Sequence, residues 1–329
     1  MLGSTVLACV LLACGANAGD PAPVTSEPSN PAPIAPADAP SQPRTAAPVA
    51  QATAALKFDG GRAFEDLRRQ VGFGPRPAGS AALAQTRQYI LAELKAAGVE
   101  AREDSWDATT PVGPIRMVNI IATIPGRRTD RIALATHYDT KREQRFRFVG
   151  ASDGASSTAA VLELARVLKG RQHEYTIELL FFDGEEAVIE WTGTDNTYGS
   201  RHYVETAQKA GTLGTLKALV LLDMIGDRNL NIRRETTSTV WLTDIIWASA
   251  RRLGYTREFI NEPFTIGGDD HFPFLAAGIP AIDIIDFDYP HWHEATDDLS
   301  QMSARSLQVV GDVVLDALPA IEQRITAAR

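Results

Sequence analysis

The sequence of 329 residues alternates short apolar runs with segments of helical spacing. The apolar runs predict strands over residues 118–124, 131–136, 176–182, 217–222 and 281–285. Apolar side chains at helical spacing predict helices over residues 87–97 and 155–168. Continuous apolar runs of this length are typical of strands that are buried on both faces. The alternation predicts an α/β fold built on a doubly wound sheet.

The pattern is different before residue 56. Residues 20–55 are rich in Pro, Ala, Ser and Thr and have few large apolar side chains, so we expect a disordered linker. Residues 1–19 are predicted to be an export signal, since their apolar run is shorter than the roughly 20 residues that span a bilayer. The run ends in Leu11-Leu12-Ala13-Cys14, which resembles a bacterial lipobox with Cys14 as the lipidated residue. Simple secretion and an untargeted apolar tail are the alternatives. Residues 56–329 are expected to form one catalytic domain.

Composition narrows the possible partners. The formal net charge is -9 and no basic cluster occurs, which argues against nucleic acid as a partner. Both cysteines, Cys9 and Cys14, lie in the predicted signal. If the chain is exported to the periplasm or cell envelope, its globular part has no cysteine, and a metal site there must use His and carboxylate ligands. Contact with a membrane is expected only through a lipid anchor.

Acidic and imidazole side chains follow four of the predicted strands. These residues are His137 and Asp139, Glu185 and Glu186, Asp223, and His293, while Asp153 comes just before the helix over 155–168. Ligands of open α/β sheets bind beyond the carboxyl ends of the strands, where these side chains would meet. Buried neighbouring carboxylates resist ionisation unless a cation is present. The sequence therefore predicts a metal site, and imidazole with carboxylate ligands favours zinc.

Each of these residues also has a purely structural interpretation. Asp153 could cap a helix, His137 could be a structural histidine, and the Glu185–Glu186 pair could be solvated surface. Their occurrence together at the ends of successive elements favours the metal site. One glutamate of the pair can bind the metal while its neighbour acts as a general base. Asp139 is in a position to orient the imidazole of His137.

The motifs resemble the M28 zinc peptidase superfamily over nearly all of residues 60–320. The similar segments are His137-Tyr138-Asp139, Gly150-Ala151-Ser152-Asp153, Glu185-Glu186, Leu222-Asp223-Met224-Ile225-Gly226 and Trp292-His293. The resemblance implies a three-layer mixed sheet flanked by helices. It also implies a zinc ion held by Asp153, Glu186 and His293, with Glu185 as the proton shuttle.

Within this superfamily the chain is most similar to the glutaminyl cyclases. The segment 181–187 followed by Trp191 is similar to the cyclase motif, and Asp269 stands where the aminopeptidases typically have Ser. The resemblance implies that Asp223 and Asp269 hold the leaving amide in an acidic network. It implies that Trp191 and Trp292 form the walls of the substrate pocket. Packing in the core is the structural alternative for the tryptophans, and a surface acid is the alternative for Asp269.

The implied activity is the conversion of an amino-terminal glutamine of peptides or proteins to pyroglutamate, with release of ammonia and one bound zinc. The alternative is an aminopeptidase with two zinc ions, in which His137 and Asp223 are further ligands. The segment Gly154-Ala155-Ser156 is as similar to the aminopeptidases as to the cyclases. A domain that binds without catalysis is a third interpretation, and the intact Glu185 argues against it.

Overall fold

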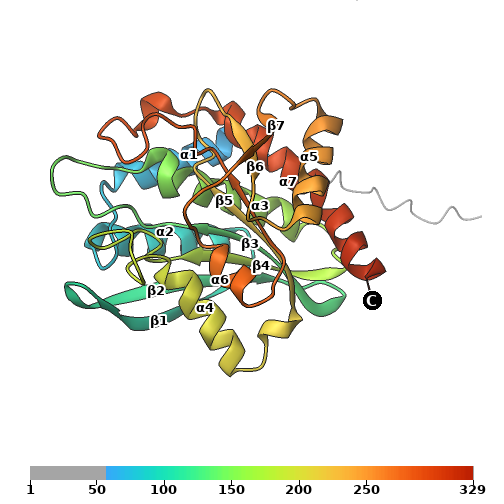
Figure 1. Cartoon of the computed structure of the whole chain (residues 1–329), viewed down its shortest axis with the longest axis horizontal. Coiled ribbons are helices and arrows are strands. Elements are labelled where there is room, and N and C mark those ends of the chain that lie inside the picture. The colour runs from blue at the N-terminus through green and yellow to red at the C-terminus, as the bar shows by residue number, and fades with distance from the viewer. Residues whose placement is uncertain (1–56, 329) are drawn as a thin grey trace, which may run out of the picture. The chain divides into compact units, whose positions relative to one another are not determined.

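The computed structural model describes residues 57–328, so the predicted export signal, the predicted linker and Cys14 lie outside the described residues. A six-stranded sheet forms the centre of this part of the chain, with the strand order β1-β2-β4-β3-β5-β8 (Figure 1). The strands are β1 (Glu100–Thr110), β2 (Gly113–Ile124), β3 (Arg128–His137), β4 (Tyr175–Phe182), β5 (Leu216–Asp223) and β8 (Ala281–Ile285). A second sheet pairs β6 (Ile232–Glu235) with β7 (Phe259–Phe264) in parallel.

The central sheet is mixed. Strands β4, β3, β5 and β8 run parallel to one another, whereas β2 is antiparallel to both β1 and β4. The chain passes from β3 to β4 on one side and then returns past β3 to β5 on the other. The carboxyl end of β3 is therefore a topological switch point, the place where open α/β sheets bind their ligands.

Helices cover both faces of the sheet. They are α1 (Gly60–Gly72), α2 (Ala81–Ala96), α3 (Ser157–Lys169), α4 (Tyr198–Lys209), α5 (Val240–Leu253), α6 (Phe272–Ala276) and α7 (Ala304–Ala327). Leu134 in β3 packs in the same core as side chains of α1, α2, α3, α5 and α7. Its neighbours Ala133 and Ala135 face the other way, toward side chains of α4 and α6. Successive residues of the buried strands thus serve two apolar layers, which confirms the predicted three-layer α/β architecture.

The predicted boundaries of individual helices and strands were less accurate than the predicted architecture. Helix α2 begins at Ala81, six residues before the predicted start, where the Ser80 hydroxyl accepts a hydrogen bond from the Leu83 amide. Helix α3 begins at Ser157 and follows a wide, irregular turn over Ala151–Ser156. The sequence pattern did not predict β1, because this edge strand is largely exposed and has a mainly polar sequence.

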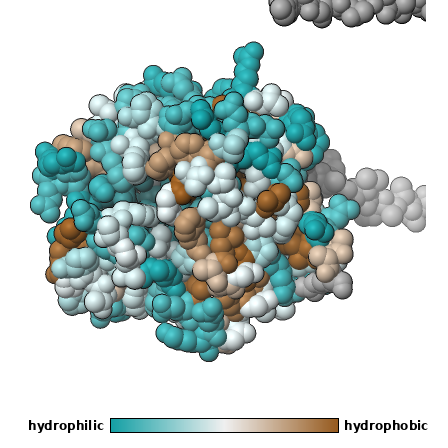
Figure 2. All heavy atoms as spheres, viewed as in Figure 1, coloured by the Kyte–Doolittle hydropathy of each residue, from teal (hydrophilic) through white to brown (hydrophobic). Residues whose placement is uncertain are grey.

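The surface of the described residues carries a mainly hydrophobic area on the face seen in Figure 1. Figure 2 shows mainly hydrophilic residues on the face presented in Figure 1, with hydrophobic residues gathered over α6 and the loops beside it. Among the described residues, no helix is both long enough and apolar enough to span a membrane.

Candidate metal centre and substrate pocket

The structure brings the predicted site residues together at the carboxyl edge of the parallel strands. His137 is the last residue of β3, Asp223 is the last residue of β5, and the Glu185–Glu186 pair follows β4 by three residues. His293 comes from the loop after β8. We define two groups that share Asp153: the front cluster of Asp153, Glu186 and His293, and the rear cluster of His137, Asp153 and Asp223.

The front cluster lies at the wall of a cavity. Nε2 of His293 lies 3.1 Å from Oε1 of Glu186 and 3.3 Å from Oδ2 of Asp153. Both carboxylates are buried, whereas the His293 side chain keeps 20% of its surface exposed. Burial lowers the pKa of His293, but the carboxylates of Glu186 and Asp153 outweigh this effect and raise it to about 10. The cluster thus favours positive charge at a position that is open to the cavity.

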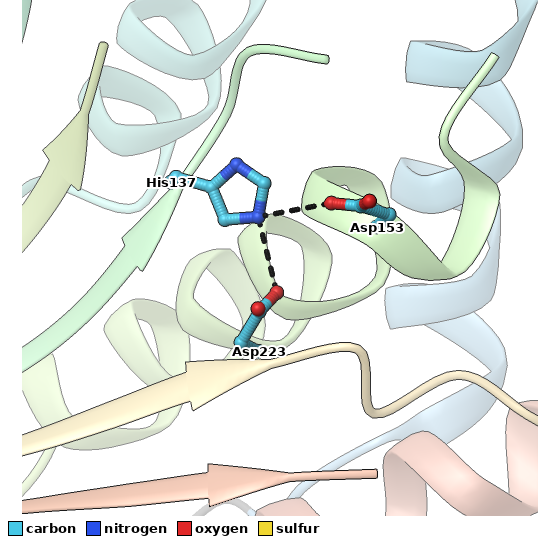
Figure 3. A group of neighbouring side chains, drawn as sticks. All are labelled: His137, Asp153 and Asp223. Carbon is cyan, nitrogen blue, oxygen red and sulfur yellow. Dashed lines mark hydrogen bonds and ion pairs between the residues drawn. The ribbon is translucent and has the colours of Figure 1, made fainter. Parts of the chain in front are cut away.

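The rear cluster is more deeply buried, although Asp153 and Asp223 also line the cavity. Nε2 of His137 lies 3.0 Å from Oδ1 of Asp223 and 3.3 Å from Oδ1 of Asp153, so the imidazole bridges the two carboxylates (Figure 3). All three side chains are buried. Burial raises the pKa of Asp223 to about 7, although the nearby imidazole of His137 opposes the shift.

Local backbone geometry directs these side chains into the site. Asp153 has φ of -80° and ψ of 100°, outside the helical region, and α3 begins only at Ser157, so the structural alternative in which Asp153 caps this helix does not apply. Gly154 follows with φ of 86°, and a Cβ atom there would lie 2.6 Å from the Asp139 carbonyl oxygen. His293 also has a positive φ, 54°. A left-handed conformation costs a non-glycine residue energy and persists where the surrounding structure holds it, as at many functional sites.

Asp139 has a different main contact from the one expected. Its Oδ1 lies 3.5 Å from Nδ1 of His137, beyond a good hydrogen bond. Its two carboxylate oxygens instead accept hydrogen bonds from the backbone amides of Glu185 and Glu186, at 3.1 and 3.3 Å. Asp139 therefore fixes the turn that carries the glutamate pair.

Glu185 is not a member of the front cluster, although it is adjacent to Glu186 in sequence. It borders the same cavity, and its Oε2 lies 3.9 Å from Nδ1 of His137. Burial raises the pKa of Glu185 well above its usual value, and the nearby acids Asp269 and Glu186 add to the shift. A carboxyl group that is beside the candidate metal ligands and has an elevated pKa can both accept and donate a proton.

The tryptophans border the cavity rather than the core. The cavity has a volume of about 270 Å³, and Trp191, Trp292, Phe287 and Ile266 form its apolar walls. Trp191 and Trp292 are 37% and 41% exposed, so the structural alternative of core packing does not apply. The Trp292 and His293 rings stack with their centroids 4.2 Å apart, so the cavity wall contacts the front cluster directly. The cavity is large enough to hold the side chain of one amino-acid residue.

Asp269 lines this cavity and is only 3% exposed, so it is not a surface acid. Together with His271 and Asp283 it forms a further buried group, whose polar atoms lie within 4.8 Å of one another. Burial raises the pKa of Asp283 well above its usual value, and the neighbouring Asp269 and Asp223 add to the effect. The sequence analysis did not identify Asp283, because it lies inside the strand β8 that was assigned as apolar.

The front cluster fits a divalent cation such as zinc. Oδ2 of Asp153 and Oε2 of Glu186 are buried and accept no hydrogen bond from the described residues. A buried carboxylate oxygen that accepts no hydrogen bond is costly, and a bound cation offsets that cost. One imidazole and two carboxylates are also a donor set of the kind that catalytic zinc sites use, with a fourth position left for water or substrate.

Two further residues were not identified from the sequence. Arg76 is completely buried and contacts the segment before Asp153. Asp297 is also buried and accepts hydrogen bonds from the backbone amides of the same segment. Neither belongs to a strand-end motif, and their partners are 73 to 145 residues away in sequence. No local pattern indicates such contacts.

Known proteins share both the sequence motifs and the fold. The family model of peptidase family M28 matches residues 119–318. The glutaminyl-peptide cyclotransferase-like protein of Bos taurus is 31% identical over 251 residues, which cover 68% of this chain and 66% of that protein. The crystal structure of an Acidobacteriales bacterium glutaminyl cyclase is 37% identical, with a TM-score of 0.78, and the match covers 87% of this chain and 100% of that chain.

A zinc-dependent exopeptidase from Parabacteroides distasonis is also similar, with 27% identity, a TM-score of 0.74, and coverage of 80% of this chain and 99% of that chain. The family model spans the glutamate pair, both clusters and Asp269. The sequence matches and the structural matches therefore agree with the motifs that the strands bring together. This chain belongs to peptidase family M28, and the relatives that it resembles there include glutaminyl-peptide cyclotransferases.

Proposed function

We propose that this protein is a zinc-dependent glutaminyl-peptide cyclotransferase that converts the amino-terminal glutamine of peptides to pyroglutamate and releases ammonia. One observation carries the proposal. The free carboxyl group of Glu185 shares a cavity of about 270 Å³ with the front cluster, the two tryptophans and Asp269. The cavity has room for one side chain, and the similarity to named glutaminyl cyclases supports the same activity.

The reaction needs one bond to form and one to break within a single substrate residue. The α-amine attacks the γ-carboxamide carbon, a five-membered ring forms, and the amide C–N bond breaks. Trp191 and Trp292 would hold the side chain folded toward its own amine, which lowers the entropic part of the barrier. Glu185 would take a proton from the attacking amine and give it to the leaving nitrogen. Asp223 and Asp269 would accept hydrogen bonds from the leaving amide.

We assign the front cluster as the zinc site, with Asp153, Glu186 and His293 as ligands and one ion per chain. Zinc in this position would supply Lewis acidity toward the γ-amide carbonyl oxygen. The rear cluster then serves as a polar support, because its His137 imidazole is buried and does not border the cavity, whereas the His293 imidazole does.

The test compares a peptide that begins with glutamine with one that begins with leucine. We expect the glutamine peptide to release ammonia and lose that mass while its chain length stays the same, and the leucine peptide to remain intact. Zinc counted in the purified protein should approach one ion per chain. Free amino acid released from either peptide would contradict the proposal.

A second candidate function is a two-zinc aminopeptidase, and the rear cluster is the observation that favours it. His137, Asp153 and Asp223 offer three ligand atoms, and Asp153 could bridge two ions. In that enzyme Glu185 would activate a water molecule instead of the substrate amine. Two zinc ions per chain and liberated leucine would support this candidate.

We further propose that the protein is exported to the cell envelope and anchored through a lipid on Cys14. The proposal rests on the apolar run that ends in Leu11-Leu12-Ala13-Cys14 and on the Pro- and Ala-rich segment after it. Expression of Cys14→Ser in a bacterial host tests it. We expect the wild-type chain to partition with membranes and the variant to leave them, and a wild-type chain that stays in the aqueous fraction would contradict the anchor.

A further inference from the structure

The turn that carries Asp153 requires support from elsewhere in the chain. It lies between Gly150, with φ of 50°, and Gly154, with φ of 86°, and Asp153 itself is non-helical. Helix α3 begins only at Ser157 and therefore does not fix the Asp153 carboxylate. The position of a residue shared by both clusters thus depends on contacts made to residues 149–153.

Arg76 supports the carbonyl side of this turn. Its guanidinium donates hydrogen bonds to the carbonyl oxygens of Val149, at 2.7 Å, and Gly150, at 3.1 Å. A third hydrogen bond reaches the Gly74 carbonyl at 3.2 Å. All three acceptors are neutral, although the arginine is completely buried. A buried charge without a directly paired counterion is costly, so its place here points to a role that a neutral side chain would not fill.

Arg76 also connects the turn to the end of β3. The backbone amide of Arg76 donates a hydrogen bond to the Thr140 hydroxyl at 2.9 Å, and the Thr140 amide donates to the Arg76 carbonyl at 3.1 Å. Thr140 directly follows Asp139, which fixes the glutamate pair. One buried residue is therefore hydrogen-bonded to two of the segments that supply the site.

Asp297 supports the amide side of the same turn. Its carboxylate accepts hydrogen bonds from the backbone amides of Ser152, at 2.8 Å, and Asp153, at 3.2 Å. Its carbonyl oxygen lies 3.3 Å from the amide nitrogen of Ala151, which donates to it. The Tyr289 hydroxyl donates a further hydrogen bond at 2.8 Å. Asp297 is four residues after His293, so it links the loops of two candidate ligands.

We propose that Arg76 and Asp297 are positioning residues that hold the turn over residues 149–153 through its carbonyl and its amide groups, and that they thereby set the affinity of the front cluster for zinc. The inference rests on the proposed zinc site but not on the choice between cyclase and aminopeptidase. Because the guanidinium contacts two successive carbonyls, lysine cannot replace it fully. Outer residues of this kind typically change metal affinity about 10–100-fold when they are replaced.

The experiment measures the zinc dissociation constant by competition with a chelator, together with the melting temperature of the metal-free protein. We expect Arg76→Lys and Asp297→Asn each to weaken zinc binding about 10–100-fold. Matched controls lie at the opposite end of the sheet. Arg131 donates hydrogen bonds to Glu178 and Thr212, and Glu322 accepts them from two backbone amides.

Arg131→Lys and Glu322→Gln should lower the melting temperature while leaving the zinc dissociation constant within about twofold of the wild type. Unchanged zinc affinity in Arg76→Lys and Asp297→Asn would overturn the inference. An equal loss in the control variants would overturn it as well, because it would indicate general loosening of the fold.

Amide hydrogen exchange in the metal-free protein gives a readout that does not depend on zinc. The amides of Ser152 and Asp153 should exchange slowly in the wild type and faster in both Arg76→Lys and Asp297→Asn. A wild type that binds no zinc would contradict the proposed function, and the exchange rates would still decide whether these two residues hold the turn.

Discussion

The front and rear clusters share Asp153 and the same types of side chain, yet their surroundings differ. The front cluster borders the cavity, and two of its buried carboxylate oxygens accept no hydrogen bond from the described residues. In the rear cluster the His137 imidazole lies between the two carboxylates. The comparison teaches that ligand type alone does not define a metal site. The imidazoles distinguish the two clusters, because the His293 side chain is 20% exposed and borders the cavity, whereas the His137 side chain is 1% exposed and does not, and this difference comes from packing.

The largest expected effect on zinc content comes from substitutions that remove a ligand of the front cluster. Glu186→Ala and His293→Ala should each lose zinc and activity, because two remaining protein ligands hold the ion poorly. Metal content after purification checks the result. His137→Ala is the matched change in the rear cluster and should retain about one zinc per chain. A fall from two ions to one in His137→Ala would show instead that the rear cluster also binds metal.

The next largest effect is expected from a substitution at Glu185 that impairs proton transfer and leaves metal binding intact. Glu185→Gln keeps the shape of the side chain but removes the proton acceptor, so kcat should fall about 10²–10⁴-fold. Zinc content should stay at the wild-type level, because Glu185 belongs to neither cluster. Near-normal turnover in this variant would show that another group moves the proton.

A smaller effect is expected at Asp269 in the cavity wall. Asp269→Ser introduces the residue that the resemblance implies for the aminopeptidases and removes the proposed acceptor for the leaving amide. We expect cyclisation to fall about tenfold or more, as for the loss of one charged hydrogen bond of roughly 1.5–3 kcal/mol. Steady-state kinetics with a glutamine peptide measure it, and zinc content is the control. An unimpaired variant would weaken the assignment of cyclase activity.

The smallest effect concerns stability outside both clusters. Burial raises the pKa of Asp286 to about 7, whereas an unfolded aspartate titrates near ~3.9. Between these values the unfolded chain has released a proton that the folded chain retains, so the unfolding free energy falls as the pH rises from about 4 to about 7. Asp286→Asn should flatten this slope and raise the unfolding free energy by about 1–2 kcal/mol at pH 7. This is part of the cost of ionising Asp286 in the folded protein, since each unit of pKa difference corresponds to about 1.4 kcal/mol.

Denaturant unfolding at several pH values checks this prediction. Asp107→Asn is a control at an exposed position, and it should change stability by less than about 0.5 kcal/mol at every pH. A pH slope that is the same in Asp286→Asn and in the wild type would show that Asp286 titrates normally in the folded protein.

The sequence predicted the buried strands well and the polar edge poorly. Strand β8 matches its predicted range, 281–285, and β3, β4 and β5 differ from theirs by one to three residues at an end. Continuous apolar runs are strong local signals, because both faces of such a strand must be covered. Strand β1 has no such run, because a strand at an exposed edge does not need apolar side chains. Its pairing with β2 identifies it as a strand only in the folded chain.

The same division holds within the site. The sequence by itself determined which side chains follow each strand, and the parallel arrangement of the strands then places them at one edge of the sheet. Only the tertiary structure decided that Asp139 holds the glutamate turn and that Arg76 and Asp297 hold the Asp153 turn. The physical reason is that strand patterns depend on neighbouring residues, whereas these hydrogen bonds join positions that are 46 to 145 residues apart and meet only after folding.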